Sequence, residues 1–413
     1  MEKINGVKNL VLIGGGHSHA IVLLMFGMKP LPGVRLTLIS DVTHTPYSGM
    51  LPGHIAGFYN YNECHINLLS LSQFAQAQIF IDKAIALDLD KNQVICNERE
   101  PVNFDILSID IGSTPNTLSV EGAEKYTTPA KPVTEFLTNW NQLIEQYQNH
   151  QNSLRIGIVG GGAGGVELAL NMQSRLLTLA SIPTKNLAIK SATKYLPEIH
   201  LFHRDIQLMT GHNQLVRRRL EKILIDRGIQ LHLGETVCKI DKAESSFTTH
   251  NQLPITHYQL QCESGLKMKF NRIFWVTQAA APNWIKTSGL STDNQGFIQV
   301  NDYLQSVSHP QIFAAGDIAT MINHPRPKAG VFAVRQGKPL FENLQRLLLG
   351  KPLKPFVPQK QYLGLIGTGN KNAIASRGSI MWESPLLWYW KNWLDRQFMK
   401  KFSNVSNSFP NRL

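Results

Sequence analysis

The chain has 413 residues, of which 43% are hydrophobic and 17% are charged, a composition typical of folded globular protein and not of a disordered chain. At roughly 100–200 residues per domain, this length predicts two to four domains. Lysine and arginine outnumber aspartate and glutamate by 41 to 29, and the net charge of +12 favours anionic partners without selecting nucleotides, lipid or nucleic acid among them.

The cysteines and the N-terminus indicate the compartment in which the protein works. The four cysteines are far apart and show no CxxC spacing, so we expect neither a disulfide framework nor a metal site. The apolar run Leu10–Ile13 stops at three glycines and is too short for a signal peptide. No stretch approaches the ~18 apolar residues of a membrane-spanning helix. We therefore expect a cytoplasmic protein that begins at or near Met1.

Residues 9–20 predict a buried strand that turns through glycines into a helix, the opening of a βαβ unit. Gly14 and Gly16 fit a dinucleotide-binding turn, while His19 stands at the position of its third glycine. A side chain at that position would push the helix off the strand unless the imidazole reached a phosphate or a carbonyl group. A histidine that is simply packed or exposed is the favoured interpretation.

The following strand, Val34–Ile39, should end in an acidic residue that binds the ribose hydroxyls of the nucleotide. Ser40 occupies the usual place of this acid, and Asp41 follows one residue later. Asp41 would point to the opposite side if the strand continued, so either residue is a candidate for the ribose contact.

A second strand, glycine turn and helix begins at Arg155. Gly160 permits a tight turn, Gly162 lets a pyrophosphate approach the backbone, and Gly165 lets the helix pack closely on the strand. Two such units predict an α/β protein with two Rossmann-like dinucleotide-binding domains. We expect a polar hinge at residues 149–153, before the second unit.

Three further motifs carry a resemblance to a known family. Residues 105–115 resemble a chain crossing after a first half-domain, and residues 273–283 its counterpart after the second domain. Residues 296–306, followed by 312–317, resemble a flavin-closing motif. With the two glycine turns, they resemble the pyridine nucleotide-disulfide oxidoreductase superfamily, flavoproteins with two dinucleotide-binding domains. The resemblance implies that Asp317 hydrogen-bonds the ribityl chain of FAD.

The same resemblance implies how the chain is divided. It implies a discontinuous FAD-binding domain made of residues 1–115 and 290–350. An NAD(P)H-binding domain of residues 150–285 is inserted into it. Residues 351–413 form a small C-terminal region with an amphipathic helix.

The segment 45–53 indicates a branch of the superfamily. It holds no cysteine, whereas disulfide reductases carry a CxxxxC dithiol there, so disulfide reduction is excluded. It resembles instead the flavin-covering loop of type II NADH dehydrogenases and sulfide:quinone reductases, with Pro46 and Tyr47 screening the flavin. Residues 326–337 resemble the helix beneath the flavin, which implies that residues 328–330 lie near the ring.

The electron acceptor is less well indicated. Type II dehydrogenases commonly carry glutamines along the helix that lines the quinone pocket. Here Gln336 remains, but Val331 and Arg335 stand at the other two positions. The closest resemblance is to the flavoprotein domain fused ahead of selenide, water dikinase, and it is carried by residues 14–19, 44–53 and 364–370.

The end of the second strand of the second unit indicates the nicotinamide nucleotide. His203 stands where NADH enzymes place an acid, and Arg204 follows it. This pair partly resembles the His-Arg-Arg of NADPH-using flavoproteins, so we favour NADPH over NADH. Glu167 would approach the nicotinamide, or it is only an acid that the helix dipole favours in the first turn.

The segment 384–402 predicts an amphipathic helix with Ser384 as N-cap and Pro385 as first residue. Its aromatic stripe suits a peripheral membrane contact, as in monotopic quinone reductases, and the alternatives are packing on the body of the protein or a homodimer contact. The predicted apolar face consists of Leu387, Trp390, Leu394, Phe398 and Phe402, opposite Asn392, Arg396 and Lys400, with Lys391 and Lys401 beside the stripe.

We therefore predict an FAD-dependent NAD(P)H oxidoreductase that delivers electrons to a quinone-type acceptor. A sulfide- or selenium-linked flavin oxidoreductase and a non-enzymatic flavin redox sensor are the alternatives. Nucleic-acid binding is not expected, because the charge forms no basic stripe with interleaved aromatics. The candidate catalytic residues are Glu167 and Lys328. The candidate cofactor-binding residues are Gly14, Gly16, His17, Ser18, His19, Ser40, Asp41, Pro46, Tyr47, Gly112, Ser113, Gly160, Gly162, Gly165, His203, Arg204, Gly316, Asp317, Ala329 and Gly330.

Overall fold

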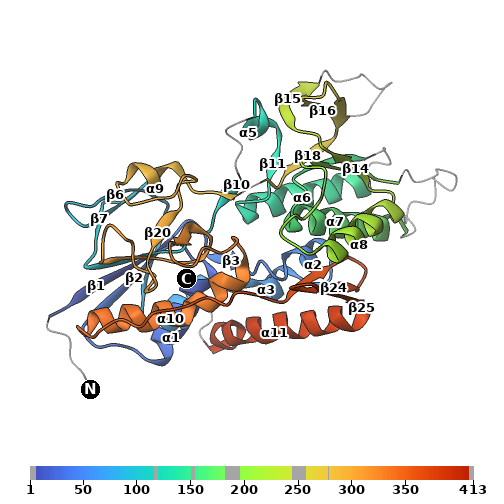
Figure 1. The fold of residues 1–413 in the computed structure, drawn as a ribbon. Coiled ribbons are helices and arrows are strands. Elements are labelled where there is room, and N and C mark those ends of the chain that lie inside the picture. The colour runs from blue at the N-terminus through green and yellow to red at the C-terminus, as the bar shows by residue number, and fades with distance from the viewer. Residues whose placement is uncertain are drawn as a thin grey trace.

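The molecule has two α/β lobes side by side, with a C-terminal segment that runs beneath both of them (Figure 1). The computed structural model describes residues 6–115, 120–149, 154–181, 196–243, 257–277 and 279–408. The first lobe is on the left of Figure 1 and the second lobe is on the right. Each lobe is centred on a five-stranded parallel sheet, which confirms the predicted α/β class.

The first sheet joins strands that are far apart in the sequence. In spatial order they are β21 (Ile312–Ala314), β9 (Ile106–Ile109), β1 (Lys8–Ile13), β2 (Val34–Ser40) and β5 (Gln78–Ile81). Residues 10–13 are at most 2% exposed, so both faces of β1 are covered, as is usual for a parallel strand. Helices α1 (His17–Met28) and α10 (Gly330–Leu348) pack against each other on this sheet, with the ring centroids of Phe26 and Phe341 4.9 Å apart.

Smaller elements complete the first lobe. They are β3 (His44–Pro46), α2 (Leu51–Ile55), α3 (Tyr61–Cys64), β4 (His65–Asn67), α4 (Leu68–Phe74), β6 (Ala84–Asp88), β7 (Gln93–Cys96), β8 (Val102–Asn103), α9 (Asn283–Thr287), β20 (Ile298–Val300), the 3-10 helix η1 (Gly316–Ile318) and β22 (Ala319–Met321). Ile285 of α9 is fully buried in the core of this lobe. The first lobe therefore resumes before residue 290, because the apolar side of α9 needs this core to cover it.

The second lobe repeats the architecture. Its parallel sheet has the order β11 (Thr128–Pro129), β18 (Arg272–Trp275), β12 (Arg155–Val159), β13 (Glu198–His203) and β14 (Gln230–Leu233). An antiparallel sheet of β15 (Val237–Ala243), β16 (His257–Cys262) and β17 (Lys267–Phe270) lies beside it. Its helices are α5 (Ala123–Tyr126), α6 (Val133–Asn149), α7 (Ala163–Ser181) and α8 (Gln214–Asp226).

The second lobe begins earlier in the chain than residue 150. β11 pairs with β18, and Phe136 and Trp140 of α6 are at most 2% exposed in the core of this lobe. The predicted hinge at 149–153 lies outside the described residues except for Asn149, which ends α6. The chain crosses between the lobes instead at β10 (Thr114–Pro115) and β19 (Ala279–Ala280), which pair antiparallel.

The C-terminal segment connects the two lobes. It forms an antiparallel sheet of β23 (Gly364–Gly367), β24 (Ala373–Arg377) and β25 (Ile380–Ser384), followed by α11 (Pro385–Ser408). Arg219 of α8 forms an ion pair with Glu383 of β25, while Phe402 of α11 is buried in the core of the first lobe. Among the described residues, no helix is both long enough and apolar enough to traverse a bilayer.

The start of α11 confirms the predicted cap, because Ser384 Oγ accepts a hydrogen bond from the Leu386 N–H. Its predicted apolar face is only half right. Leu387, Phe398 and Phe402 are buried, but Trp390 and Leu394 are 44% and 40% exposed. The buried face includes Lys391 and Asp395 instead, because these two side chains neutralise each other.

Candidate active site

The first glycine turn, between β1 and α1, has geometry that only glycine tolerates. Gly14 has a φ of +88°, and a Cβ atom there would lie 2.4 Å from the Asp110 carbonyl oxygen. The Gly16 N–H donates to that same oxygen over 3.1 Å. No described residue accepts a hydrogen bond from the N–H of Gly15 or His17. These two donors at a helix N-terminus are free for an anionic group such as a pyrophosphate.

Asp110 is a buried acid that the sequence did not single out. Its carboxylate accepts hydrogen bonds from the N–H groups of Ser18 (2.8 Å) and His19 (3.1 Å), the first turn of α1. Burial raises the pKa of Asp110 to about 7, against the effect of these N–H donors, which favour the ionised form. Its position at the end of a buried strand was the available signal.

His19 supports the first turn from behind and does not face a ligand. Its Nδ1–H donates to the Gly14 carbonyl (2.7 Å), and its Nε2 therefore accepts from the Ser108 hydroxyl (2.8 Å). The side chain is fully buried, and burial lowers its pKa to about 4. His19 thus contacts β9 and not, as predicted, the cofactor. The small side chain of Ser108 on β9 leaves room for the imidazole.

Three other predicted cofactor residues of the first lobe have different surroundings. The Ser18 hydroxyl is buried and donates to the Ala333 carbonyl (2.7 Å), so it joins α1 to α10 and does not face the turn. The Ser40 hydroxyl donates to the Val42 carbonyl (2.9 Å) at the end of β2. Asp41 is exposed next to it at this edge of the sheet.

The loop Pro46–Met50 closes over the first turn. Its Ser48 N–H donates to His17 Nε2 (3.4 Å), and the ring of Tyr47 lies edge-on to the His17 ring with centroids 5.4 Å apart. A Cβ atom on Gly330 would lie 2.6 Å from Ser48 Oγ, so the loop rests on the N-terminus of α10. Burial lowers the pKa of His17 to about 4, so this imidazole is neutral at pH 7. The loop, the turn and α10 therefore enclose one site.

Asp317 lies in a polar group that spans the two lobes. Lys131, which precedes α6, donates both to Asp317 (3.0 Å) and to the Ser113 hydroxyl (3.0 Å). Gly112, next to Ser113, has a φ of +70° and open space around it. Sequence reasoning missed Lys131, because its partners are distant in the chain and no local motif marks it.

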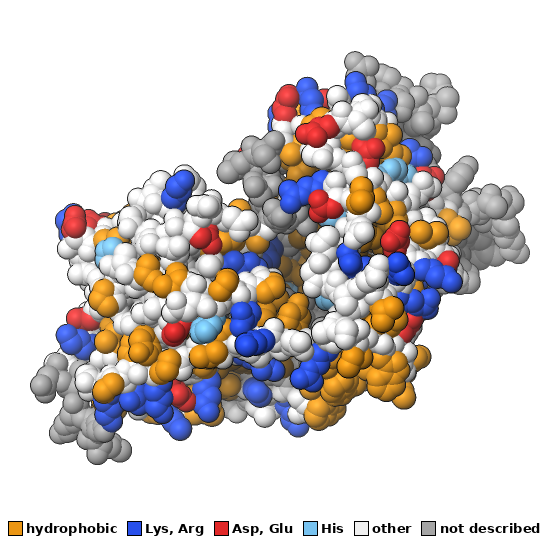
Figure 2. Space-filling model, viewed as in Figure 1, with side chains coloured by type: hydrophobic (Ala, Val, Ile, Leu, Met, Phe, Trp, Pro, Cys, Tyr) orange, Lys and Arg blue, Asp and Glu red, His pale blue; other side chains and the backbone are white. Residues whose placement is uncertain are grey.

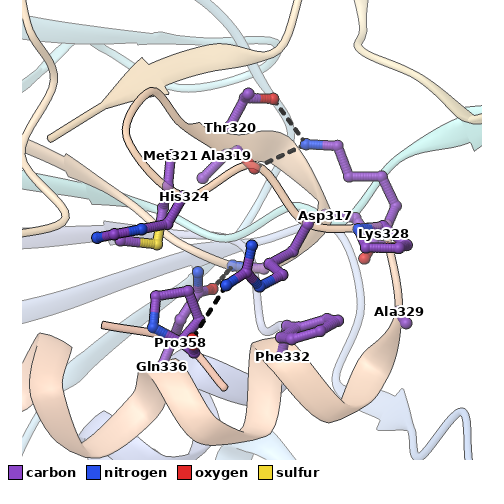
Figure 3. A pocket seen from close by; sticks show the side chains of 13 residues that line it. Asp317, Ala319, Thr320, Met321, His324, Lys328, Ala329, Phe332, Gln336 and Pro358 are labelled. Atoms are coloured by element: carbon purple, nitrogen blue, oxygen red, sulfur yellow. Dashed lines mark hydrogen bonds between the residues drawn. The ribbon is translucent and has the colours of Figure 1, made fainter. Parts of the chain in front are cut away.

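A narrow pocket lies between η1 and the N-terminus of α10 (Figure 3). Figure 3 shows Lys328 reaching back toward Thr320 and Ala319. The Lys328 amine donates to the Ala319 carbonyl (2.7 Å) and the Thr320 hydroxyl (2.9 Å), 4.0 Å from the centre of the Phe297 ring. Burial lowers the pKa of Lys328 to about 8, although nearby carboxylates oppose this shift. Lys328 is therefore an amine that can change protonation state near neutral pH.

The residues around this pocket explain two features of the sequence. Gly316 has a φ of +71°, and its N–H donates to Gln336 Oε1 (2.7 Å). The one glutamine that remained of the expected quinone-pocket set is thus buried in a structural hydrogen bond. Ala329 is the N-cap of α10, and Arg335 is exposed and donates to Gln359.

The second glycine turn, between β12 and α7, matches the predicted division of labour among its glycines. Gly160 has a φ of +125°, and a Cβ atom there would lie 2.4 Å from the Val276 carbonyl oxygen. A Cβ atom on Gly165 would lie 1.8 Å from the Gly160 carbonyl oxygen, so strand and helix could not pack as they do. Gly162 is exposed, with nothing within 4 Å of an added Cβ atom. The open side of this turn can therefore admit a phosphate group.

The predicted nicotinamide residues surround this second turn. His203 accepts a hydrogen bond from the Gly161 N–H through Nδ1 (3.2 Å), and its Nε2 lies 3.4 Å from Asp205. The Arg204 side chain is 57% exposed beside it. Glu167 accepts a hydrogen bond from the Gly367 N–H (2.8 Å) of β23, and burial raises its pKa. The C-terminal segment thus contacts the residue predicted to act at the nicotinamide.

The cysteines have none of the features of a reactive dithiol. All four are free, and Cys64, Cys96 and Cys262 are buried. Burial raises the pKa of Cys64 and of Cys262 to about 12 in each case. Neither thiol is ionised at neutral pH, and a thiolate is the reactive form.

Two glycine turns at helix N-termini, one in each lobe, fit two dinucleotides. A scan against family models matches residues 8–337 to the pyridine nucleotide-disulphide oxidoreductase family. The chain belongs to this family. The match includes both lobes and ends within α10.

Individual relatives are distant in sequence but similar along most of their length. The NADH dehydrogenase-like protein YutJ of Bacillus subtilis is 23% identical over 403 residues, 94% of this chain and 99% of the relative. The demethylphylloquinone reductase NdbB of Synechocystis is 23% identical over 324 residues, 76% of this chain and 70% of the relative. The sulfide:quinone oxidoreductase of Aquifex aeolicus has the same fold, with a TM-score of 0.74 at 17% identity, covering 97% of this chain and 92% of that one.

Proposed function

We propose that the protein is an FAD-dependent NAD(P)H oxidoreductase that passes electrons to a quinone-type acceptor. The observation that carries this proposal is the pair of glycine turns, one per lobe, in which added Cβ atoms at Gly14, Gly160 and Gly165 would collide with backbone. Such turns leave helix N–H donors for the pyrophosphates of two different dinucleotides. Membership of a flavoprotein oxidoreductase family supports the same conclusion.

FAD fits the first lobe. The N–H groups of Gly15 and His17 would hold its pyrophosphate, and Asp317 would bind its ribityl chain, with Lys131 balancing the charge of that acid. The N-terminus of α10 at Gly330 would lie near the ring, where positive charge favours the reduced flavin. Bound FAD supplies the capacity to accept a hydride and to pass electrons onward.

NAD(P)H fits the second lobe. The open turn at Gly162 would bind its pyrophosphate, and Glu167 would lie toward the nicotinamide. His203 and Arg204 replace the acid that would bind two ribose hydroxyls, so we expect a preference for NADPH. Asp205 beside them weakens this positive charge, so NADH should also be used.

A quinone acceptor is favoured by the printed names of relatives, which include a demethylphylloquinone reductase and a sulfide:quinone oxidoreductase. Sulfide as electron donor is disfavoured, because the buried cysteines are protonated at neutral pH. Within this family, we place the chain nearest to the flavoprotein domain fused ahead of selenide, water dikinase, on the resemblance of residues 14–19, 44–53 and 364–370.

A peripheral membrane contact through α11 belongs to the same proposal. Figure 2 shows hydrophobic side chains gathered over the corner formed by β25 and the start of α11. They include Ile380, Trp382, Leu386, Tyr389, Trp390, Trp393 and Leu394, each at least 40% exposed. Such a cluster suits the interface of a bilayer from which a quinone could arrive, and a homodimer contact is the alternative use of this surface.

Turnover with purified protein tests the function. The protein would be mixed with NADPH or NADH and a soluble quinone analogue, and nucleotide oxidation would be followed at its absorbance band. We expect many turnovers with the quinone and a higher kcat/KM for NADPH than for NADH. Flavin reduction without repeated turnover would indicate a redox sensor, and reduction by sulfide but not by NAD(P)H would indicate the sulfur-linked alternative.

A further inference from the structure

The inner face of α11 carries an ion pair where apolar side chains would be expected. Lys391 Nζ lies 2.6 Å from Asp395 Oδ2, and the two side chains are only 16% and 8% exposed. Lys391 also donates a hydrogen bond to the Gly49 carbonyl oxygen, 342 positions earlier in the chain. The C-terminal helix is therefore hydrogen-bonded to the Pro46–Met50 loop.

The same loop meets α11 through a second contact. The ring of Tyr47 lies on the ring of Phe398, with centroids 4.5 Å apart. Burial and the Asp395 carboxylate together raise the pKa of the Tyr47 hydroxyl. Phe398, one turn beyond Asp395, is itself buried against the first lobe. Two turns of one helix thus contact two consecutive parts of the loop, the Tyr47 ring and the Gly49 backbone.

On its other side the loop contacts α1 and the start of α10, both in the first lobe. The Ser48 N–H donates to His17, and Ser48 Oγ lies against Gly330 at the start of α10. The loop is short, and the neighbouring chain holds it by three backbone bonds, from the Tyr47 N–H to the Cys64 carbonyl, from the Met50 N–H to the Tyr47 carbonyl and from the His54 N–H to the Met50 carbonyl. The Gly49 and Tyr47 contacts with α11 add two further attachments to these bonds.

A buried ion pair is costly to form, because both charges lose their hydration. An apolar pair at these two positions would bury as well and would not reach the Gly49 carbonyl. The Lys391 ammonium group donates to the Asp395 carboxylate and to the Gly49 carbonyl at the same time, so this ion pair also binds the loop.

We propose that Lys391 and Asp395 are positioning residues that hold the Pro46–Met50 loop over the flavin, so that the C-terminal helix forms part of the active site. This inference rests on the proposed function, because it takes the loop to be the cover of a bound flavin. Asp395 orients the Lys391 ammonium, and Lys391 fixes the loop through the Gly49 carbonyl.

The test uses the whole FAD-loaded protein and compares K391M, K391R and D395N with the wild type. K400M is the matched control, because Lys400 is an exposed lysine on the same helix. The readouts are quenching of flavin fluorescence by iodide, the KM and kcat for ferricyanide as a small soluble acceptor, and the melting temperature.

We expect K391M and D395N to raise the iodide quenching constant by about threefold or more, since the cover of the site is released. KM for ferricyanide should fall with little change in kcat. K391R should behave like the wild type, because arginine keeps the charge and the reach, and K400M should change nothing.

Equal quenching in the wild type, K391M and D395N would overturn the inference. If K391M does not fold, D395N decides alone, because it keeps the shape of the side chain and removes only its charge. These outcomes differ from a failure of the proposed function, which would appear in the wild type as a flavin that NAD(P)H does not reduce.

Discussion

His19 shows how one side chain can replace a glycine that the fold normally requires. The imidazole fills the space between α1 and β9, where it donates a hydrogen bond to the Gly14 carbonyl and accepts one from the Ser108 hydroxyl. Because it must stay neutral to accept the Ser108 hydroxyl, the folded state disfavours its protonation. The turn is therefore kept at the cost of sensitivity to acid.

Replacing His19 by glutamine should reduce the loss of stability in acid. The unfolded imidazole takes up a proton near its ordinary pKa of 6.5, whereas the folded one does so at about 4, so its contribution is lost as pH falls between these values. For one such group the loss from pH 7 to pH 5 is roughly 2 kcal/mol in the free energy of unfolding. Urea unfolding of H19Q and wild type at both pH values measures it.

The effect of His19 is the difference between H19Q and the wild type in the change of unfolding free energy from pH 7 to pH 5. Asp110, with its pKa raised to about 7, acts in the opposite direction, since its protonated form is stabilised in the folded state. It is present in both proteins and its effect cancels in the difference. An identical change from pH 7 to pH 5 in both would contradict the assignment.

Lys131 and Asp317 should contribute to FAD binding as a pair. Removing the lysine leaves the carboxylate uncompensated near the anionic cofactor, so K131M should weaken FAD binding by about tenfold. D317N should weaken it as well, and the double variant should be little worse than D317N alone. Titration of apo-protein with FAD, followed by flavin fluorescence, gives the three dissociation constants, and strictly additive losses would show that the two residues act independently.

The turn between β12 and α7 uses glycine for two different purposes, close packing at Gly165 and open space at Gly162. An added Cβ atom at Gly165 meets the Gly160 carbonyl at 1.8 Å, whereas none of the described atoms comes within 4 Å of one at Gly162. G165A should therefore lower the stability of the second lobe by about 1–3 kcal/mol and impair NAD(P)H binding.

G162A is the matched control for that variant. It should melt like the wild type and still raise the KM for NADPH, because its methyl group stands where the pyrophosphate approaches the backbone. Thermal melting and steady-state kinetics of both variants distinguish packing from binding. A wild-type KM in G162A would show that the dinucleotide does not lie at this turn.

The outer face of α11 should govern association with lipid. Trp390 and Trp393 are 44% and 56% exposed, so the W390S/W393S variant should fold normally. It should lose about tenfold in binding to vesicles that contain anionic lipid, measured by co-sedimentation. I206S, which changes the 79% exposed Ile206 of the second lobe, is the control and should bind like the wild type. Unchanged binding of the tryptophan variant would favour a homodimer contact for this face.

The sequence predicts the second glycine turn well but not which face of α11 is buried. The strand, glycine turn and helix at residues 155–181 follow from local spacing, because the reasons for each glycine lie within a few residues. The face of α11 does not. Lysine and aspartate are normally exposed, and the burial of Lys391 and Asp395 depends both on their ion pair and on the distant carbonyl of Gly49.

At the scale of the whole molecule, the two lobes are joined by two crossing strands and by the C-terminal segment (Figure 1). The resemblance of residues 105–115 and 273–283 to family chain crossings predicted where the chain passes between the lobes, and Thr114 pairs with Ala280 there. The contacts that join the lobes through side chains were not predictable. Lys131 with Asp317 and Glu167 with Gly367 pair across 186 and 200 positions, and no local pattern marks such partners.

These contacts place three segments around the proposed flavin site: the Pro46–Met50 loop, the start of α10 and the Lys131 segment of the second lobe. Reducing equivalents would enter from the second lobe and leave toward an acceptor. The predictions on FAD binding and on the Pro46–Met50 loop depend on a flavin held between these segments.

Anaerobic titration of the purified protein tests this claim most directly. We predict a yellow protein that contains or takes up FAD, and whose flavin absorbance is bleached by one equivalent of NADPH or NADH. A colourless protein that does not bind added FAD, or a flavin that neither nucleotide reduces, would contradict the account.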